Sequence, residues 1–304
     1  MTVQAAPAVG TVAPSPTDPG HGPRKPPRNP DSISRTFFRK PSVMIYGTIL
    51  ILMVLASLIG PLLTGDPFST SHPRFQPPSL EFPLGTDNLG RDYLARVLNG
   101  GRVSLLVGFS VAALCVTVAL IVGGLAGFCG GVLDIVLVKV SEFFQVIPGL
   151  VLALVAAALL GANITIIVII LAVTMWPGVA RIVRAEAMRI AQLGYVESQR
   201  AAGFSGLRIL WSDVVPNALP PVLVATTMTV ARAILAESGL SFLGIGDANQ
   251  PSWGALLNQA QPYIATAWWL PLFPGLCIFI VVLAINMLGD ALNDALNPSI
   301  GKVK

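Results

Sequence analysis

The stretch VMIYGTILILMVLASLIGPLL, residues Val43–Leu63, contains 21 residues and no charged side chain. A helix needs about 20 apolar residues to cross the hydrocarbon layer of a membrane. The apolar core of a cleaved signal peptide is shorter, about 7–15 residues, and lies close to the N-terminus. Because this run is longer and begins later, the sequence predicts an uncleaved membrane anchor helix.

Five further apolar runs follow, and each is predicted to cross the membrane. They cover Val103–Gly127, Phe143–Leu160, Ile164–Ala180, Ala218–Leu235 and Leu270–Leu288. Pro148 is predicted to kink the third of the six crossings. Of the 304 residues, 54% are apolar and 11% are charged, whereas a soluble domain has about 25% charged residues. The predicted fold is therefore an all-α membrane protein with six transmembrane helices, which places both termini on one side.

Lys and Arg side chains indicate which side that is. Six of them lie in the second half of residues 1–40, five lie in the loop 181–217, and the loop 240–269 has none. The loop 64–102 carries four, an exception, but four acidic residues accompany them. Since cytoplasmic segments carry the excess of basic residues, both termini and the loop 181–217 are predicted to be cytoplasmic. Residues 1–40 also contain eight prolines and few apolar residues, and a disordered cytoplasmic tail is predicted there.

Several classes of protein are excluded by what the chain lacks. Cys115, Cys129 and Cys277 lie in or beside apolar runs without C-x-x-C spacing, so neither a disulfide framework nor a zinc site is indicated. His21 and His72 lie outside the apolar runs, so an intramembrane serine hydrolase would have no base. The net charge of +4 sits mostly beside apolar runs, where membrane orientation explains it, and nucleic-acid binding is not indicated. Without a G-x-x-x-x-G-K-[ST] phosphate loop, the chain is not expected to bind ATP. No catalytic residue and no metal ligand is predicted.

The loop 181–217 mixes charged with apolar positions. Gly203 can break a helix between two short amphipathic pieces, and Pro216 is predicted to end the second piece before the fifth crossing. The apolar residues include Phe204 and Leu207, and an apolar patch that faces water is costly unless something covers it. Two interpretations remain open: the segment folds against its own membrane domain, or it docks a cytoplasmic protein.

The run YVESQRAAGFSGLRILWSDVVPN, residues Tyr195–Asn217, resembles the cytoplasmic coupling motif of binding-protein-dependent ABC importer permeases. Glu197, Gly203 and Pro216 fall at the matching positions, whereas Ser198-Gln199 replace two alanines of the motif. The resemblance implies that five residues form an ATPase-coupling site: Glu197, Gly203, Phe204, Leu207 and Pro216.

Further motifs extend this resemblance over about residues 36–300. They are FPLGTDNLGRD (Phe82–Asp92), AESGLSFLGIG (Ala236–Gly246), PSWGALL (Pro251–Leu257), FPGL (Phe273–Leu276) and NMLGDALNDALNP (Asn286–Pro298). Together and in this order they look like the C-type subunit of dipeptide and oligopeptide permeases. The glycines of the first motif suit tight turns, and Asp87 or Asp92 can cap the helix that follows.

The resemblance implies an architecture and a function. Residues 41–102 would hold the anchor helix and an extracytoplasmic loop, and residues 103–298 a five-helix MetI-like permease core. The chain would be a permease subunit of an ATP-driven importer of di- or oligopeptides in the bacterial cytoplasmic membrane, working by alternating access and catalysing no reaction. Its expected partners are a second homologous permease, ABC ATPase subunits that bind ATP and Mg, an extracytoplasmic substrate-binding protein and membrane lipid. Alternatives are a permease for nickel chelates, glutathione or another small solute, a non-transporting scaffold or receptor subunit, and a proton-coupled transporter.

Two charged residues lie at membrane depth in the fifth crossing. Arg232 and Glu237 are five residues apart, which is about 7.5 Å along a helix axis. Charges in such a position are a functional hypothesis by default. We hypothesise that both belong to the substrate path and that Arg232 contacts a carboxylate of the passing substrate. The alternatives are that Arg232 extends toward the outer interface or pairs with Glu237. Trp253, Trp268 and Trp269 are interpreted as interfacial anchors, or as a surface for a binding protein.

Overall fold

The computed structural model describes residues 40–146, 148–161, 163–247 and 249–296. Within those ranges the chain is helical apart from turns, loops and one isolated bridge between Thr86 and Asp92. The predicted tail at residues 1–40 lies outside the described residues except for Lys40.

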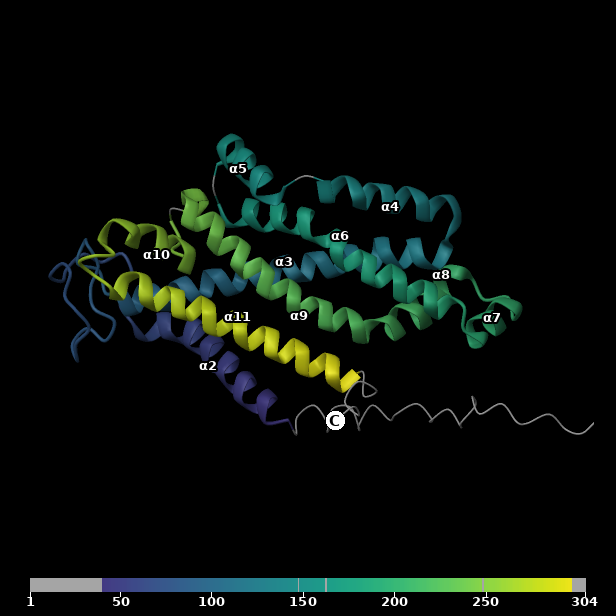
Figure 1. Ribbon diagram of the computed structural model, residues 1–304, viewed down its shortest axis with the longest axis horizontal. Helices are drawn as coiled ribbons and strands as arrows, with labels where there is room; N and C mark the ends of the chain where they lie inside the picture. The colour runs from purple at the N-terminus through teal and green to yellow at the C-terminus, as the bar shows by residue number, and fades with distance from the viewer. Residues whose placement is uncertain (1–39, 147, 162, 248, 297–304) are drawn as a thin grey trace, which may run out of the picture.

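The longer helices form an elongated bundle (Figure 1). They are α2 (Pro41–Leu63), α3 (Tyr93–Cys129), α4 (Gly131–Val146), α5 (Gly149–Leu160), α6 (Ile164–Ala191), α9 (Val215–Leu240) and α11 (Trp269–Leu296). Shorter helical segments connect them: α7 (Gly194–Ala201), α8 (Gly206–Ile209), η1 (Leu210–Val214), η2 (Ser241–Ile245), α10 (Trp253–Ala260) and η3 (Gln261–Tyr263).

Five helical stretches are long and apolar enough to cross a membrane. They are α2, α3, α6, the run Gly206–Ile245 that contains α9, and α11. Helices α4 and α5 meet the same criterion only as a pair bent by 74°, and the predicted kink at Pro148 falls at this bend, where Pro148 precedes α5. The prediction of an all-α membrane fold is thus confirmed, with five helical stretches that could cross a membrane, or six if the bent pair forms one span.

Helix α3 lies at the centre of the bundle and packs most extensively against α6, and then against α9 and α2. The contact with α6 is close because α3 carries glycine where the backbones meet. A Cβ on Gly123 would lie 2.4 Å from the carbonyl oxygen of Ala180, and one on Gly127 would lie 2.4 Å from that of Arg184. Helix α11 packs between α9 and α2 (Figure 1).

Two helices extend beyond the predicted crossings. Helix α3 begins ten residues earlier than predicted, at Tyr93, because the Asp92 carboxylate accepts a hydrogen bond from the Leu94 N–H (2.9 Å) and caps the helix. Helix α6 continues past Ala180 to Ala191. Charged residues set the predicted limits of the crossings, but a helix can continue with charged side chains once it leaves the hydrocarbon layer.

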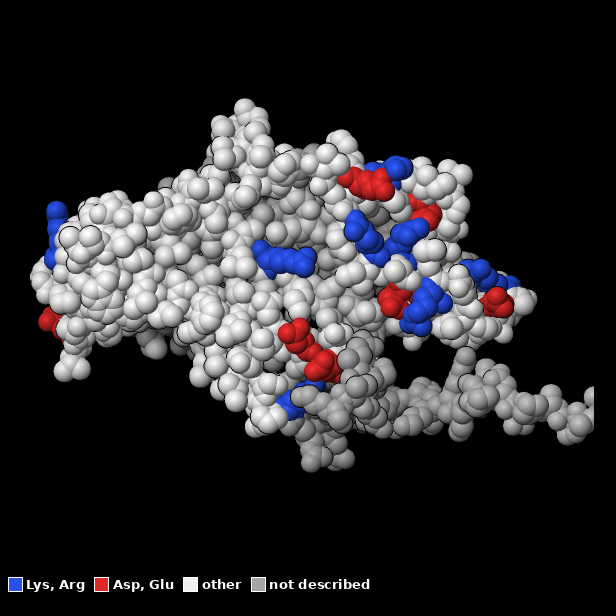
Figure 2. All heavy atoms as spheres, viewed as in Figure 1, with Lys and Arg blue, Asp and Glu red and all other residues white. Residues whose placement is uncertain are grey.

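The bundle has two distinct ends. Helices α7 and α8 form one end, and α10 with the connection from α2 to α3 forms the other (Figure 1). On the face shown in Figure 2, Lys and Arg side chains gather toward the end that carries α7. The candidate sites lie at both ends and between them.

Candidate functional site

The segment from α7 to η1 contains the predicted coupling residues. The chain turns between α7 and α8 at Gly203, whose φ of +84° is in the region that favours glycine. The Gly203 N–H donates to the Arg200 carbonyl (3.0 Å) and the Phe204 N–H to the Gln199 carbonyl (3.1 Å), which ends α7. The predicted helix break at Gly203 is confirmed.

Pro216 does not end the second piece, and that prediction is wrong. Residues Gly206–Ile245 form one continuous helical run, in which Pro216 occupies the first turn of α9. Proline has no N–H, and in a regular helix its ring clashes with the carbonyl four residues earlier. The π-helical turn η1 immediately precedes α9 and changes the hydrogen-bond pattern at this point, so the helix continues through the proline.

One face of this segment packs against the membrane domain. Val196 of α7 and Ile209 of α8 are buried with Ile190 of α6 and Ala218 of α9. The Arg200 guanidinium lies 4.9 Å from the centre of the Phe128 ring at the end of α3, a favourable cation–π distance. Helix α7 therefore packs against α6 and α3, within a buried cluster that also includes Ala218 of α9.

The opposite face is exposed and apolar. Phe204 is 44% exposed, Leu207 63% and Trp211 45%, and the Glu197 side chain is also exposed. Beside them lies a cavity of about 250 Å³ lined by Gln199, Phe204, Arg208, Ile209, Ser212 and Asp213. The Gln199 Oε1 atom is buried and accepts no hydrogen bond from the described part of the chain. The interpretation that the segment folds against its own membrane domain is thus confirmed for one face, and docking of a cytoplasmic protein on the other face stays a prediction.

The structure separates Arg232 from Glu237, although both belong to α9. Arg232 is exposed and lines a groove between α6 and α9. Glu237 is 2% exposed and accepts hydrogen bonds from the hydroxyls of Ser104 (3.1 Å) and Ser241 (2.7 Å). The alternative that Arg232 pairs with Glu237 is wrong, because five residues correspond to about 140° around a helix and turn the two side chains to different faces.

Glu237 instead belongs to a buried polar contact that joins several elements. Ser104 comes from α3 and Ser241 from η2. The Ser104 oxygen also accepts a hydrogen bond from the Trp253 backbone N–H at the start of α10 (3.2 Å). One carboxylate therefore connects α3, α9 and η2, and it reaches α10 through the Ser104 hydroxyl. This arrangement gives Glu237 a structural task rather than a place in an open path.

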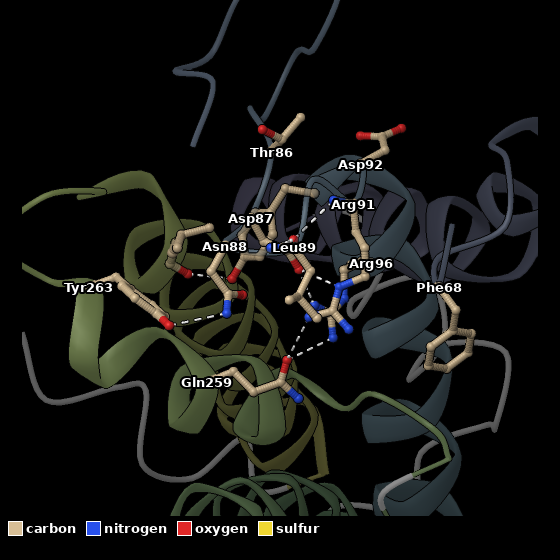
Figure 3. Close-up of polar contacts among 12 residues, drawn as sticks. Phe68, Thr86, Asp87, Asn88, Leu89, Arg91, Asp92, Arg96, Gln259 and Tyr263 are labelled. Carbon is tan, nitrogen blue, oxygen red and sulfur yellow. Dashed lines mark hydrogen bonds and ion pairs between the residues drawn. The ribbon is translucent and has the colours of Figure 1, made fainter. Parts of the chain in front are cut away.

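The motif Gly85–Asp92 forms a charged network at the other end of the bundle (Figure 3). The Asp87 Oδ1 atom accepts hydrogen bonds from the backbone N–H groups of Leu89 (2.8 Å) and Arg91 (3.0 Å). Its Oδ2 atom forms ion pairs with Arg91 Nε (2.6 Å) and with Arg96 Nη1. The Gln259 side chain, from α10, accepts from Arg96 Nη2 (2.8 Å). Asp87 thus ties the loop to α3, and Arg96 ties α3 to α10.

Sequence reasoning offered Asp87 or Asp92 as the cap of the following helix, and it missed this network. Asp92 is the cap, while Asp87 organises the loop and neutralises two arginines. Burial alone would raise the pKa of the Asp87 carboxyl, but the N–H groups of Arg91 and Leu89 and the Arg96 guanidinium outweigh burial and lower that pKa. The only sequence signal was the pair Asp87 and Arg91 at i and i+4; Gln259 is far away in sequence.

The tryptophan interpretation is corrected for two of its three residues. Trp253 is 1% exposed and Trp269 5%, and only Trp268 of the three is exposed. The Trp253 Nε1–H donates to the Val97 carbonyl (2.9 Å), and the Trp269 Nε1–H donates to the Thr86 carbonyl (3.2 Å). The Trp253 ring thus joins α10 to α3, and the Trp269 ring joins α11 to the loop before α3; neither ring faces a membrane interface.

Comparison with known proteins identifies the family of this chain. The family described as "Binding-protein-dependent transport system inner membrane component" matches residues 119–302, well over half of the chain. The chain belongs to this family. The resemblance seen in the sequence motifs is therefore confirmed, and this binding-protein-dependent permease is a multi-pass protein of the inner membrane and a transport subunit, not an enzyme.

Individual relatives agree with this assignment. The putative peptide transport system permease protein of Brucella suis biovar 1 is 42% identical over 268 residues, 87% of this chain and 90% of that relative. The dipeptide transport system permease protein DppC of Bacillus subtilis is 37% identical over 256 residues, 83% of this chain and 80% of DppC. A solved structure of the inward-facing MetNI methionine ABC transporter matches 67% of this permease and 97% of that chain, with a TM-score of 0.56. At a sequence identity of 21%, this structural match shows a shared MetI-like fold and nothing beyond it. Family membership also implies ATPase and substrate-binding partners.

Proposed function

We propose that this chain is one of two permease subunits in an ATP-driven importer of di- and oligopeptides. Its relatives from Brucella suis and Bacillus subtilis are described as peptide and dipeptide permeases and align along most of the chain. Substrate would cross between this permease and a homologous second one as the helix bundle alternates between inward-facing and outward-facing states. The chain contributes no covalent chemistry and binds no cofactor; ATP and Mg belong to the ATPase partner.

The two-faced segment from α7 to η1 carries this proposal. Its exposed apolar face would dock the ATPase through Phe204 and Leu207. Glu197 and Gly203 would shape α7 and its end. Pro216 lies in the first turn of α9, the helix to which movement of the ATPase would be passed. Its buried face packs on α3, α6 and α9. Because this contact is direct, a displacement of α7 by the ATPase would move these helices as well. The docking end, and with it both termini, would be cytoplasmic, in agreement with its basic side chains.

The opposite end would receive the substrate-binding protein. There the Asp87 network and the buried tryptophans join the loop 64–92, α3, α10 and α11 into one unit. A binding protein that docks on this unit would be mechanically connected to α3, which also contacts the coupling end through Phe128. Membrane lipid would cover the exposed apolar faces of the outer helices.

The test is co-purification of the tagged chain from gently solubilised membranes, with the associated chains identified by mass spectrometry. We expect a second permease and an ATPase with a phosphate loop. Leu207→Asp should remove the ATPase but not the second permease, whereas Met188→Ser, a change at an exposed residue of α6, should remove neither. Uptake of a radiolabelled dipeptide by the reconstituted complex should require ATP and the binding protein, and competition by nickel chelates or glutathione would redirect the substrate assignment. Recovery of neither partner would support the scaffold alternative instead.

A further inference from the structure

A groove of about 490 Å³ opens between α6 and α9 in the middle of the bundle. Its volume is within the range of sites for small molecules, about 300–1,000 Å³. One wall is a stripe on α9 at positions 221, 225, 228 and 232, which share a face of that helix, and α6 provides the other wall. Gln145, near the end of α4, also lines the groove.

The lining of the groove is mostly apolar and adaptable. Met175 of α6 and Met228 of α9 both line it, and methionine side chains adjust to ligands of different shape. At Gly178 a Cβ atom would meet no atom within 4 Å, so the groove is open to the backbone there. Such a surface suits a ligand whose side chains vary while its ends stay the same.

The groove has few polar groups, and the hydrogen bonds that they already form determine whether each can donate or accept. The hydroxyls of Thr174 and Thr229 donate to carbonyl groups of their own helices, at Ile170 (3.1 Å) and Ala225 (2.8 Å). Their oxygen atoms can then only accept further hydrogen bonds. Besides the neutral amide of Gln145, the groove therefore offers hydroxyl acceptors to N–H groups and one cationic donor, the guanidinium of Arg232.

Arg232 has no counter-charge within the described part of the chain. It forms neither an ion pair nor a hydrogen bond with any other described residue, and the acidic residue nearest to it on α9, Glu237, is engaged by serines on another face. Arg232 lies eight residues, or about 12 Å, from the end of α9 at Leu240, well within the crossing. An arginine at this depth normally pairs with another group or faces a watery cavity.

We propose that Arg232 is a specificity-determining residue that binds the terminal carboxylate of a peptide as it passes through this groove. This inference rests on the proposed function, because it names the part of a peptide that the permease itself recognises. A guanidinium binds a carboxylate through two parallel hydrogen bonds. The carboxylate is common to all short peptides, so recognition by Arg232 leaves the methionine-lined walls free to accept different side chains.

The test compares two forms of one dipeptide, a C-terminal acid and its C-terminal amide, as ligands of the assembled transporter without its binding protein. Each form competes against a dipeptide fluorescently labelled on its side chain. We expect Arg232→Gln to weaken binding of the acid about tenfold or more and to leave binding of the amide unchanged. Arg232→Lys should restore part of the difference, since a lysine keeps the charge but not the bidentate geometry. Arg102→Gln, at an exposed arginine of α3 outside this groove, should leave both ligands unaffected. Gly178→Phe should reduce binding of both forms by filling the groove.

Any one of the following outcomes would overturn the inference. Equal affinity of the wild type for acid and amide, or no measurable binding of either, would mean that the carboxylate is not recognised here. Equal weakening of both forms by Arg232→Gln would indicate a purely structural role. Loss of the second permease on co-purification of Arg232→Gln would mean that Arg232 pairs with an acidic residue of that subunit. Binding-protein-dependent uptake of the dipeptide acid by the wild type is measured in parallel: if it is present while the inference fails, the proposed function stands, and if it is absent, the proposed function fails.

Discussion

The substitution Asp87→Asn isolates the charge of the buried network at the outer end of the bundle. The Asp87 side chain is 3% exposed and that of Arg96 is 2% exposed. Asparagine has the same shape, and its oxygen can still accept the N–H groups of Leu89 and Arg91, so the loss falls on the two ion pairs. Hydrogen bonds to charged groups contribute about 1.5–3 kcal/mol each. Their sum agrees with the loss of about 3–5 kcal/mol that follows removal of one partner from a buried ion pair.

Thermal unfolding of the purified chain in detergent measures this loss, and proteolysis of residues 64–92 locates it. Asp92→Asn is the matched control: it neutralises a carboxylate in the same motif, but asparagine caps a helix about as well as aspartate, so we expect almost no change. Adding Arg96→Met to Asp87→Asn should recover part of the stability, because it removes the buried guanidinium that Asp87→Asn leaves without a counter-charge. If Asp87→Asn and Asp92→Asn proved equally stable, the network would not hold the loop to α3.

Three further outcomes are expected. The pKa of the Asp87 carboxyl is lowered in the folded chain. The contribution of Asp87 to stability is therefore complete above its unfolded pKa of about 3.9 and is lost as the pH falls through the lower folded value. Resistance of residues 64–92 to pepsin should disappear only in that acidic range. Gly90→Ala should cost more than about 2 kcal/mol in thermal unfolding, since φ is +74° and the new Cβ would lie 2.0 Å from the His72 carbonyl oxygen, whereas Gly65→Ala meets no atom within 4 Å and should change stability by less than about 0.5 kcal/mol. Glu237→Ala leaves two buried hydroxyls without an acceptor and should destabilise the chain by about 1–3 kcal/mol or more, while Glu237→Gln keeps an acceptor oxygen and should cost less; equal effects of the two would contradict the assigned hydrogen bonds.

The crossings could be predicted from the sequence because an apolar run of sufficient length has few alternatives in water. Their ends could not, since a charged residue marks where lipid ends rather than where a helix ends. Helix α3 begins at its Asp92 cap, inside a stretch that carries Arg96 and would be judged a loop by charge alone. Pro216 was misjudged for a related reason: a π-helical turn lets the helix continue through it, and sequence patterns do not reveal such a turn.

The candidate sites divide in the same way. Gly203 could be predicted as a helix break because a positive φ and glycine go together. The burial of Trp253 and Trp269 could not be predicted, since an aromatic ring near a membrane surface has the same sequence context whether it anchors in lipid or packs on a neighbour. The contact between Arg96 and Gln259 joins residues 163 positions apart, and no local sequence pattern around either residue predicts it.

The contrast between Arg96 and Arg232 connects these observations to function. Both are arginines on long helices of the bundle, and from the sequence either could serve a substrate. Asp87 and Gln259 satisfy Arg96 within the chain, so folding alone accounts for its presence. No described residue does the same for Arg232, which is exposed in a groove rather than buried in a network. On the proposal made above, a ligand that passes through the groove accounts for this cation. For this reason we expect substitution of Arg96 to lower the stability measured by unfolding, and substitution of Arg232 to reduce discrimination between the acid and amide ligands.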